Sequence, residues 1–495
     1  MGVMPAEATR ANVVAMELLR VGGSRDDLLG LSDVPDLHIV GPSAVDRGDG
    51  SWLVSVYAPD GRAEELRERG LTVEPLKRAA QLSEEWAVAV SPLEAAGAGY
   101  LDSAALAQRL RDLAAAQPDV CSCAPLANRT HEGREVLQLR IGNGADATVV
   151  VIGGVHAREW APPDALLSLA EGLVRSYAGG AALEHPEWID QSSGDGIPYA
   201  PWSVPAADVK EIVERLTLVL VPLVNPDGRD YTLDASDDLH RMWRKNRRPP
   251  APGGTGPWCH GVDLNRNFDL AWDFERYYNA SGARQVRSSK RPCDPEIYIG
   301  PAAASEPETL NVQSLVELDR PSHFLDVHSY SRAILFPWGM DDDQGRDPSE
   351  SFRNPDWDRG GPHGGRDGVG GVYGEFLPTD LAAAHQAIGR RMRDAIRDQA
   401  GSDPVARRRS MYTVKQALGL YPTTGTSDDW CAGLAMLGDQ IPPIHAFCLE
   451  CGIDRAPDDP SDDEGGFHPD YRLKFPKIER EVHAAVLALA RSALA

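Results

Sequence analysis

The sequence has few cysteines and no long apolar run. Seven cysteines occur among 495 residues, which is too few for a disulfide scaffold, and the odd count leaves at least one unpaired. No stretch approaches the ~18–20 uninterrupted apolar residues that a membrane-spanning helix requires. The first residues, MGVMPAEATRANVVAMELLR, lack the basic segment and apolar block of a secretory signal peptide. We therefore expect neither a transmembrane segment nor a signal peptide.

Basic side chains are also scarce relative to acidic ones. The chain has 50 Lys and Arg against 74 Asp and Glu, which gives a formal net charge of −24. Nucleic acid is therefore not an expected partner, because phosphate binding requires a basic face. The 42% of hydrophobic residues is enough for a large core, and the length favours a main domain with an appendage.

Two features of the sequence point to different compartments. Cys259 and Cys293 are spaced so that a disulfide could close the loop between them, and a disulfide points to an oxidising, extracellular compartment. The missing signal peptide points instead to the cytoplasm by default. The sequence fixes neither the compartment nor the oligomeric state.

The chain divides into residues 1–98 and 99–495, with a Gly- and Ala-rich boundary at 95–99. The first part reads as a small α/β appendage, with strands at 51–59 and 71–76 around a short helix at 62–70. The second part alternates apolar strands with helices. Strands are expected at 136–141, 147–153, 216–228 (where the strand ends in a turn), 323–328, 333–338 and 444–450, and helices at 101–116, 163–177, 380–399 and 478–494.

Strands that are apolar throughout and alternate with helices predict an α/β fold. Such strands form a mostly parallel sheet with helices on both faces. Ligands of these folds bind at the carboxyl ends of the strands. The segments 178–205 and 340–378 are rich in Gly, Pro, Asp and Ser, and we expect them to be surface loops.

Polar residues follow several of these strands. His156 and Glu159 come just after the strand VVVIGG, and His328 ends the strand FLDVH. A catalytic zinc site needs three N or O ligands and one open position, which these three side chains would supply. Asp263, in GVDLNRNFD, is a candidate for holding one of the imidazoles in the required tautomer. The ordinary alternatives are a surface loop with a capping glutamate and a hydrogen-bonded core histidine.

The motifs HAREW, NPDG, MWRKNRR, GVDLNRNFD, HSYS and LYPTTGTSDDW, and then a glutamate in a late strand, resemble those of a known family. They are similar to zinc carboxypeptidases of the pancreatic A/B type, over residues 99–495. The resemblance implies an α/β domain around a mixed, mostly parallel eight-stranded sheet. It also implies an enzyme that removes residues one at a time from the C-termini of peptides or proteins.

The resemblance assigns roles at matching positions. His156, Glu159 and His328 would be the ligands of one Zn²⁺. Glu450 would be the general base, and Arg244 would stabilise the oxyanion of the tetrahedral intermediate.

Further positions match the family's substrate-binding residues. Asn265, Arg266 and Tyr421 would bind the terminal carboxylate, and Arg158 would be an accessory arginine along the peptide channel. Asp428 matches the bottom of the side-chain pocket, where a buried carboxylate needs a cation. We therefore expect a preference for C-terminal Lys or Arg.

Three further features of the sequence concern the cysteines near Glu450 and the N-terminal residues. Cys448 precedes Glu450 by two residues, so strand alternation places both side chains on one face, and Cys451 on the other. Residues 1–98 stand where many relatives carry an inhibitory propeptide. The dibasic pair Lys77-Arg78 offers a cleavage point after it.

Other functions stay open. Arg244 could belong to a solvated basic face, Arg266 or Glu450 could be a structural ion pair, and Tyr421 could simply pack against the sheet. A second class of function is a non-catalytic zinc- or peptide-binding relative, since some members of the family have lost the catalytic glutamate or the metal ligands. A third class is a related zinc amidase that acts on cell-wall or acylated amino-acid substrates.

Overall fold

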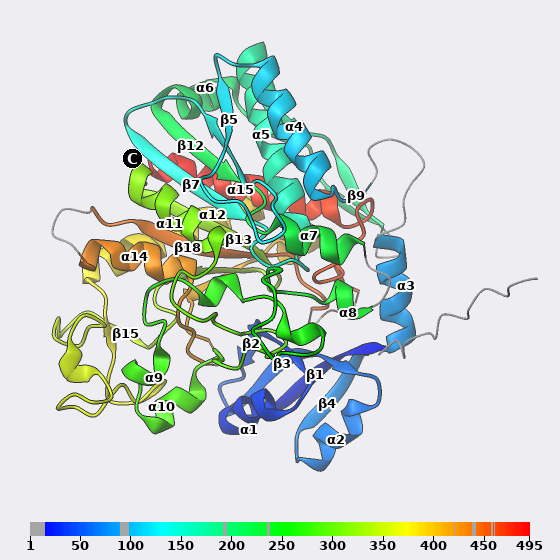
Figure 1. Ribbon diagram of the computed structural model, residues 1–495. Coiled ribbons are helices and arrows are strands. Elements are labelled where there is room, and N and C mark those ends of the chain that lie inside the picture. The colour runs from blue at the N-terminus through cyan, green and yellow to red at the C-terminus, as the bar shows by residue number, and fades with distance from the viewer. Residues whose placement is uncertain are drawn as a thin grey trace, which may run out of the picture.

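The main domain is built around an eight-stranded mixed sheet, which the computed structural model places at the centre of the molecule (Figure 1). The structure describes residues 15–89, 99–191, 196–234, 238–419, 421–437, 442–456, 459 and 461–495. The strands run in the order β17 (Thr413–Gln416), β14 (Ala333–Phe336), β18 (His445–Cys451), β13 (His323–Ser329), β7 (Ala147–Gly153), β12 (Leu216–Val221), β6 (Leu137–Ile141) and β5 (Cys121–Pro125).

The pairing in this sheet is mostly parallel. Parallel pairs join β17 to β14, β18 to β13, β13 to β7 and β7 to β12. Antiparallel pairs join β14 to β18, β12 to β6 and β6 to β5. The mixed, mostly parallel sheet expected from the sequence is confirmed.

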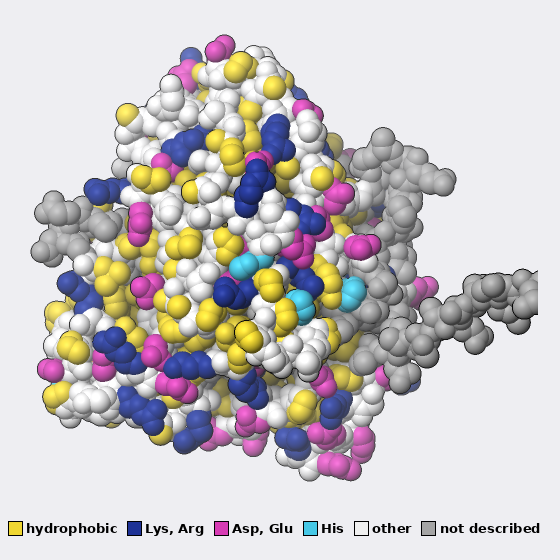
Figure 2. Space-filling view, in the orientation of Figure 1, with side chains coloured by type: hydrophobic (Ala, Val, Ile, Leu, Met, Phe, Trp, Pro, Cys, Tyr) yellow, Lys and Arg dark blue, Asp and Glu magenta, His cyan; other side chains and the backbone are white. Residues whose placement is uncertain are grey.

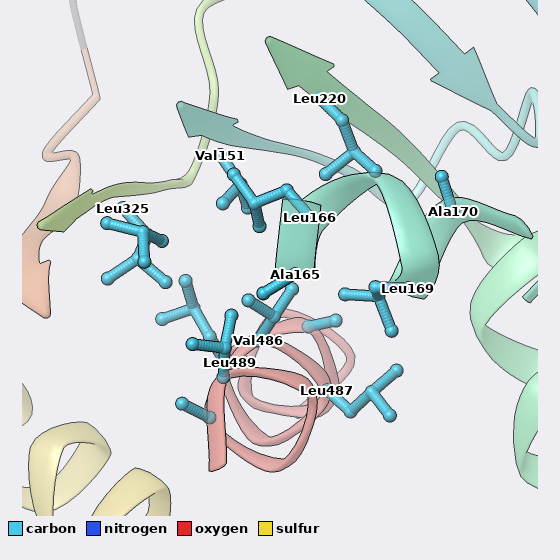
Figure 3. Close-up of a cluster of buried hydrophobic side chains, with 14 of the residues drawn as sticks. Val151, Ala165, Leu166, Leu169, Ala170, Leu220, Leu325, Val486, Leu487 and Leu489 are labelled. Carbon is cyan, nitrogen blue, oxygen red and sulfur yellow. The ribbon is translucent and has the colours of Figure 1, made fainter. Parts of the chain in front are cut away.

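Both faces of the central strands are buried. On β7, Val149 and Val151 belong to one core cluster, and Val150 and Ile152 belong to the other. Burying such a side chain contributes about 1.5–3 kcal/mol, which is why these strands are apolar throughout. Figure 3 shows the first cluster, where Val151 and Leu220 face helices α5 and α15.

Helices cover each of these faces. The first cluster lies under α4 (Ser103–Ala116), α5 (Ala161–Gly179), α6 (Ala206–Arg215), α12 (Thr379–Gln399) and α15 (Phe475–Ser492). The second lies under α11 (Pro307–Asp319) and α14 (Ser427–Leu437). Short helices lie in the connections: α7 (Pro226–Leu233), α8 (Asp238–Arg241), α9 (Phe274–Tyr277), α10 (Ala280–Gln285) and α13 (Pro404–Arg409).

The N-terminal unit, which is residues 15–89, contains a separate antiparallel sheet, drawn in blue in Figure 1. Its strands run in the order β2 (His38–Asp46), β3 (Ser51–Pro59), β1 (Met16–Ser24) and β4 (Thr72–Lys77). Its helices are α1 (Arg25–Leu29), α2 (Arg62–Glu68) and α3 (Ala79–Ala89). The predicted boundary falls on residues 90–98, which lie outside the described part of the chain.

Two segments expected to be surface loops contain short strands. In 178–205, β8 (Leu183–His185) pairs with β11 (Trp202–Val204), and β9 (Trp188–Asp190) pairs with β10 (Ile197–Tyr199). In 340–378, β15 (Asp343–Gln344) pairs with β16 (Glu375–Phe376). Runs of two or three residues between Gly and Pro are too short to show an alternating pattern, so the sequence could not reveal them.

Acidic and basic side chains are interspersed on the face shown in Figure 2. The excess of negative charge is therefore not gathered there into one acidic area. Among the described residues, no helix combines the length and apolar character needed to cross a membrane.

Candidate metal centre and active site

Three strand ends bring the predicted polar residues together. β7, β13 and β18 are neighbouring parallel strands, and His328 is in register with Glu450. The chain leaves β7 through Gly154, where φ is +61°, and carries His156 and Glu159 back over the ends of the strands. The carboxyl edge of the sheet is therefore the site, as the fold rule predicts.

The loop that carries His156 is held by the NPDG segment. Asn225 caps helix α7 and donates its side-chain amide to the carbonyls of Val155 and Lys245, at 3.2 Å each. A side chain at Gly228 would meet Ala157, since an added Cβ lies 2.7 Å from that residue's methyl group. The backbone N–H of Ala157 donates to the carbonyl of Arg244 at 3.0 Å. These contacts explain why NPDG and HAREW occur together.

His156, Glu159 and His328 converge. Nδ1 of His156 is 2.7 Å from Oε1 of Glu159, and Nδ1 of His328 is 3.0 Å from Oε2 of Glu159. The two Nδ1 atoms are 3.0 Å apart, and all three side chains are buried. The group has the donor atoms and spacing to hold one metal ion.

Carboxylates stand behind both imidazoles. Nε2 of His156 is 3.3 Å from Oδ1 of Asp263, and Nε2 of His328 is 2.9 Å from Oδ2 of Asp326. Each carboxylate favours a proton on the Nε2 that it faces. Both Nδ1 atoms then direct lone pairs toward each other and toward the Glu159 carboxylate. These groups are all acceptors, so a cation bound between them would stabilise the arrangement.

The donor set suits zinc. Two imidazole nitrogens and a carboxylate are a ligand set of catalytic zinc sites. Burial alone would raise the pKa of Glu159, but His156 and His328 outweigh it and hold that pKa below its usual range. Glu159 therefore stays ionised, as a ligand must.

Asp326 is a site residue that sequence reasoning missed. It lies two residues before His328 on β13, so the alternation of the strand places both side chains on the same face. Its Oδ2 also accepts a hydrogen bond from Oγ of Ser427 at 2.7 Å. The pattern Asp-Val-His at a strand end was the available signal.

Glu450 lies beside the trio, in register with His328 on the neighbouring strand. It is buried, and its Oε2 has no hydrogen-bond partner among the described residues. Burial raises its pKa to about 7, Glu159 adds to the shift, and His328 and Arg244 oppose it. A cation held by the trio would lower this pKa, because nearby positive charge favours the carboxylate.

Arg244 shares Asp263 with His156. Its Nε donates to Oδ2 of Asp263 at 3.0 Å, so the far end of the guanidinium is left for the cavity. Asp263 thereby orients one imidazole and one arginine at once.

Asn265 and Arg266 follow Asp263 in a short 3₁₀ turn (Leu264–Arg266), which the Asp263 side chain caps by accepting from the backbone N–H of Asn265. Arg266 donates to the carbonyls of Arg287 and Asn265, at 2.8 and 2.6 Å. No ion pair between described residues includes it. Asn265 accepts from the backbone N–H of Ser427, which leaves its amide N–H groups available.

The remaining predicted residues surround the same space. Arg158 pairs with Glu296 at 2.6 Å and lies over the ring of Phe467. Asp428, in the first turn of α14, is buried, and burial raises its pKa. Tyr421 is packed in the core cluster of the N-terminal unit.

One cavity of about 110 Å³ connects these side chains, and we call it the central cavity. Predicted site residues that line it are His156, Arg158, Glu159, Arg244, Asn265, Arg266, Tyr421, Asp428 and Glu450. His328 and Asp263 lie behind its wall. Lining residues that the sequence did not single out include Arg287, Glu296 and Lys415, and residues Ile39 to Pro42 of β2.

The structure contains both disulfide-bonded and free cysteines. Cys259 and Cys293 form a disulfide, whereas the other five cysteines are free. Cys448 lines the central cavity, and Cys451 lies in the core on the opposite face of β18. The CxxC pair therefore forms no disulfide. No residue of the segment 340–378 lines the central cavity.

A second group with metal-ligand atoms consists of His131, Glu306 and Glu308. Glu306 already accepts hydrogen bonds from His131, Asn246 and Arg248, at 2.9, 2.8 and 2.9 Å. Arg248 supplies the positive charge here, so the group is explained as a buried polar network.

The chain belongs to a known family. A family model described as zinc carboxypeptidase matches residues 106–452. This chain is therefore a member of the zinc carboxypeptidase family, whose cofactor is Zn²⁺, and the His156, Glu159 and His328 group is the candidate site for it.

Individual relatives agree with this. Carboxypeptidase B of Astacus astacus is 30% identical over 239 residues, which cover 47% of this chain and 62% of that protein. The inactive metallocarboxypeptidase ecm14 of Talaromyces stipitatus is 31% identical over 224 residues, which cover 42% of this chain and 30% of that protein. The chain thus spans less than two thirds of the length of these relatives.

A solved structure shares the fold. The carboxypeptidase A from Helicoverpa armigera superposes with a TM-score of 0.66 at 20% identity, covering 98% of this chain and 99% of that chain. At this identity, the likeness concerns the fold alone.

Proposed function

We propose that this chain is an active zinc-dependent metallocarboxypeptidase that hydrolyses the C-terminal peptide bond of peptides or proteins. The observation that carries the proposal is that one cavity is lined by His156 and Glu159 of the metal-ligand group and by Arg266, which forms no ion pair with a described residue. An exopeptidase needs these two elements at a fixed separation, because it must recognise a free carboxylate and cleave the bond next to it.

In this proposal, His156, Glu159 and His328 hold the zinc ion. Zinc bound there supplies Lewis acidity, which activates water and polarises a carbonyl group. Asp263 and Asp326 keep the two imidazoles in the tautomer that faces the ion.

The chain's own groups perform the other steps. Glu450, whose side chain lines the central cavity, accepts a proton from the attacking water and passes it to the leaving amine. Arg244, held by Asp263, donates to the oxyanion that develops on the scissile carbonyl. Arg266 and the amide of Asn265 bind the terminal carboxylate of the substrate, and Tyr421 completes this clamp once it is free of the N-terminal unit.

The side-chain pocket is proposed to favour C-terminal Lys or Arg through Asp428. This carboxyl is buried at the central cavity, and no ion pair between described residues includes it. A cationic side chain of the substrate would supply the missing partner.

We further propose that residues 1–98 form an inhibitory segment. Ile39 to Pro42 of β2 line the central cavity, and Gly41 lies so close to Tyr421 that a Cβ there would be 1.8 Å from the hydroxyl oxygen. His38 lies 2.9 Å from Glu296, the ion-pair partner of Arg158. The N-terminal unit thus occupies the space that a peptide would need.

The structure corrects the expectation of a cleavage point at Lys77-Arg78. Lys77 is 2% exposed, and its Nζ lies 2.8–2.9 Å from carboxylate oxygens of Asp454, Asp463 and Glu85. A protease that reads both basic residues cannot reach this pair in the folded chain.

Two alternatives have less support. A non-catalytic relative, such as the one named inactive, is disfavoured because every matching position holds the residue type that the chemistry needs. A zinc amidase on acylated substrates is disfavoured by Arg266 and Asn265, which together suit a free terminal carboxylate.

The test is a substrate panel with metal analysis. Purified chain is given peptides that end in Lys, Arg, Phe or Leu, with and without chelator. It is used intact and after limited treatment with elastase, which cuts after small residues such as those of the Gly- and Ala-rich segment 95–99. Chelator-sensitive release of C-terminal residues and about one zinc per chain are expected. If no C-terminal residue is released by either form, the proposal fails. Release of Phe but not Lys or Arg would overturn the assignment of Asp428.

A further inference from the structure

The central cavity is lined by five cationic side chains: Arg158, Arg244, Arg266, Arg287 and Lys415. Three of these are paired, because Arg158 and Arg287 contact Glu296 and Arg244 contacts Asp263. Neither Arg266 nor Lys415 takes part in an ion pair between described residues. In the proposed function, Arg266 binds the terminal carboxylate of the substrate. Lys415 then remains as a lining cation to which no function has been assigned.

The register of the strands places Lys415 on the cavity side of the sheet. Leu335 on β14 pairs with Lys415 on β17 and with Cys448 on β18. Residues paired across strands point to the same face, and Cys448 lies on the face that carries Glu450. Val414, the preceding residue, packs instead against the core on the opposite face.

Lys415 therefore stands on the wall of the pocket that also holds Asp428. Leu335, Ala417 and Cys448 form the apolar part of this wall. Lys415 is half-buried; partial burial lowers its pKa and Glu450 opposes this shift, so a substrate carboxylate beside it would find a cation that is only partly hydrated. Burial and the neighbouring Asp326 raise the pKa of Asp428, which weakens its repulsion of such a group.

We propose that Lys415 is a specificity-determining residue that gives the side-chain pocket a cationic wall. The enzyme then accepts C-terminal glutamate. It also cleaves C-terminal Lys and Arg less well than an enzyme whose pocket held Asp428 alone would. The inference rests on the proposed carboxypeptidase function and refines it. Asp428 and Lys415 act on the substrate side chain in opposite directions. The result is a pocket that accepts both kinds of charge.

The experiment compares kcat/KM for acylated dipeptides that differ only in their last residue, namely Glu, Lys and Leu. It uses the full chain, before and after limited elastase treatment. In K415M, the Glu-to-Lys ratio of kcat/KM should fall by at least about ten-fold. In K415R, which keeps the charge, the ratio should stay near that of the wild type. In D428N, it should rise.

The matched control is K210M, which removes a charge from the exposed Lys210 on α6, beside Glu214. Its ratio should equal that of the wild type. An unchanged ratio in K415M would overturn the proposal. So would an equal change for all three substrates, because that result would place the effect of Lys415 on Glu450. If the wild type releases Leu yet never Glu, the proposal also fails, while the carboxypeptidase function stands. If the wild type releases none of the three residues, the carboxypeptidase function itself fails.

Discussion

Asp263 joins His156 to Arg244: its Oδ1 lies 3.3 Å from Nε2 of the imidazole, and its Oδ2 accepts from Nε of the guanidinium at 3.0 Å. Burial alone would raise the pKa of Asp263, but Arg244 and His156 hold it well below its usual range. One ionised carboxylate thus orients a proposed metal ligand and a proposed oxyanion donor. Metal affinity and turnover should depend on it together.

D263N should therefore weaken zinc binding by about 10–100-fold, since it removes the charge behind the imidazole. Competition with a chromophoric chelator measures this directly. D102N is a suitable control, because Asp102 caps α4 at the surface, away from the site. Wild-type zinc affinity in D263N would show that Asp263 does not position His156.

E450Q should keep zinc and lose turnover by at least about 10²-fold, because a general base contributes roughly that factor. Metal content and kcat are measured on the same sample. Retained turnover would mean that another group is the base.

The pKa of Glu450 should determine the pH at which activity falls on the acid side. Turnover requires ionised Glu450, so activity should fall as the pH drops through its pKa. Burial raises that pKa to about 7 and a bound cation lowers it, so the midpoint of the fall should lie below pH 7. A midpoint above this value would contradict the assignment.

G41A should increase the activity of the intact chain several-fold. The added methyl group would meet the Tyr421 hydroxyl and push β2 away from the cleft. Activity on a peptide substrate is measured before and after limited elastase treatment, and the treated forms should be equally active. G30A is the control, since a Cβ at Gly30 meets no atom within 4 Å. An intact G41A chain no more active than the wild type would count against the inhibitory contact.

K77M should destabilise the chain by about 3–5 kcal/mol, because it leaves the buried Asp454 without its cation. Chemical denaturation measures the loss. Adding D454N should restore part of it, since the uncompensated charge is then gone. No recovery in the double variant would show that packing of the lysine stem, rather than its charge, is what matters.

H385F should stabilise the chain, most clearly in acid. His385 is fully buried, and burial together with the neighbouring His445 lowers its pKa to about 3. The unfolded chain takes up a proton near pH 6.5, whereas the folded chain does not, so this residue's contribution to stability falls as the pH drops below 6.5. The stability gap between H385F and wild type should therefore widen by about 2 kcal/mol between pH 7 and pH 5. A gap that stays constant with pH would contradict this.

The sequence predicted the central strands and the metal-ligand group because each rests on a local pattern. β7 is apolar over its whole length, and His156 and Glu159 follow it directly. β17 was not predicted, since its four residues, Thr413 to Gln416, are half-exposed at the sheet edge and mostly polar. For the same reason, the sequence did not indicate that Lys415 lines the central cavity.

Contacts between distant segments could not be predicted. Nothing near Gly41 indicates that Tyr421 lies against it, and nothing near Lys77 indicates three carboxylates around its ammonium group. Asp326 is different, because its spacing from His328 was visible and its alternation on the strand was overlooked.

The buried ammonium of Lys77 has a consequence for how the two parts of the chain would separate. Trp86, nine residues further on, is also buried, at 1% exposure. A protease that cuts beyond residue 89 would sever the backbone and leave this anchor intact. The cleaved protein should then remain a tight complex of two pieces. The N-terminal unit would leave the cleft only as fast as the Lys77 ammonium group breaks its contacts with three carboxylates and becomes hydrated.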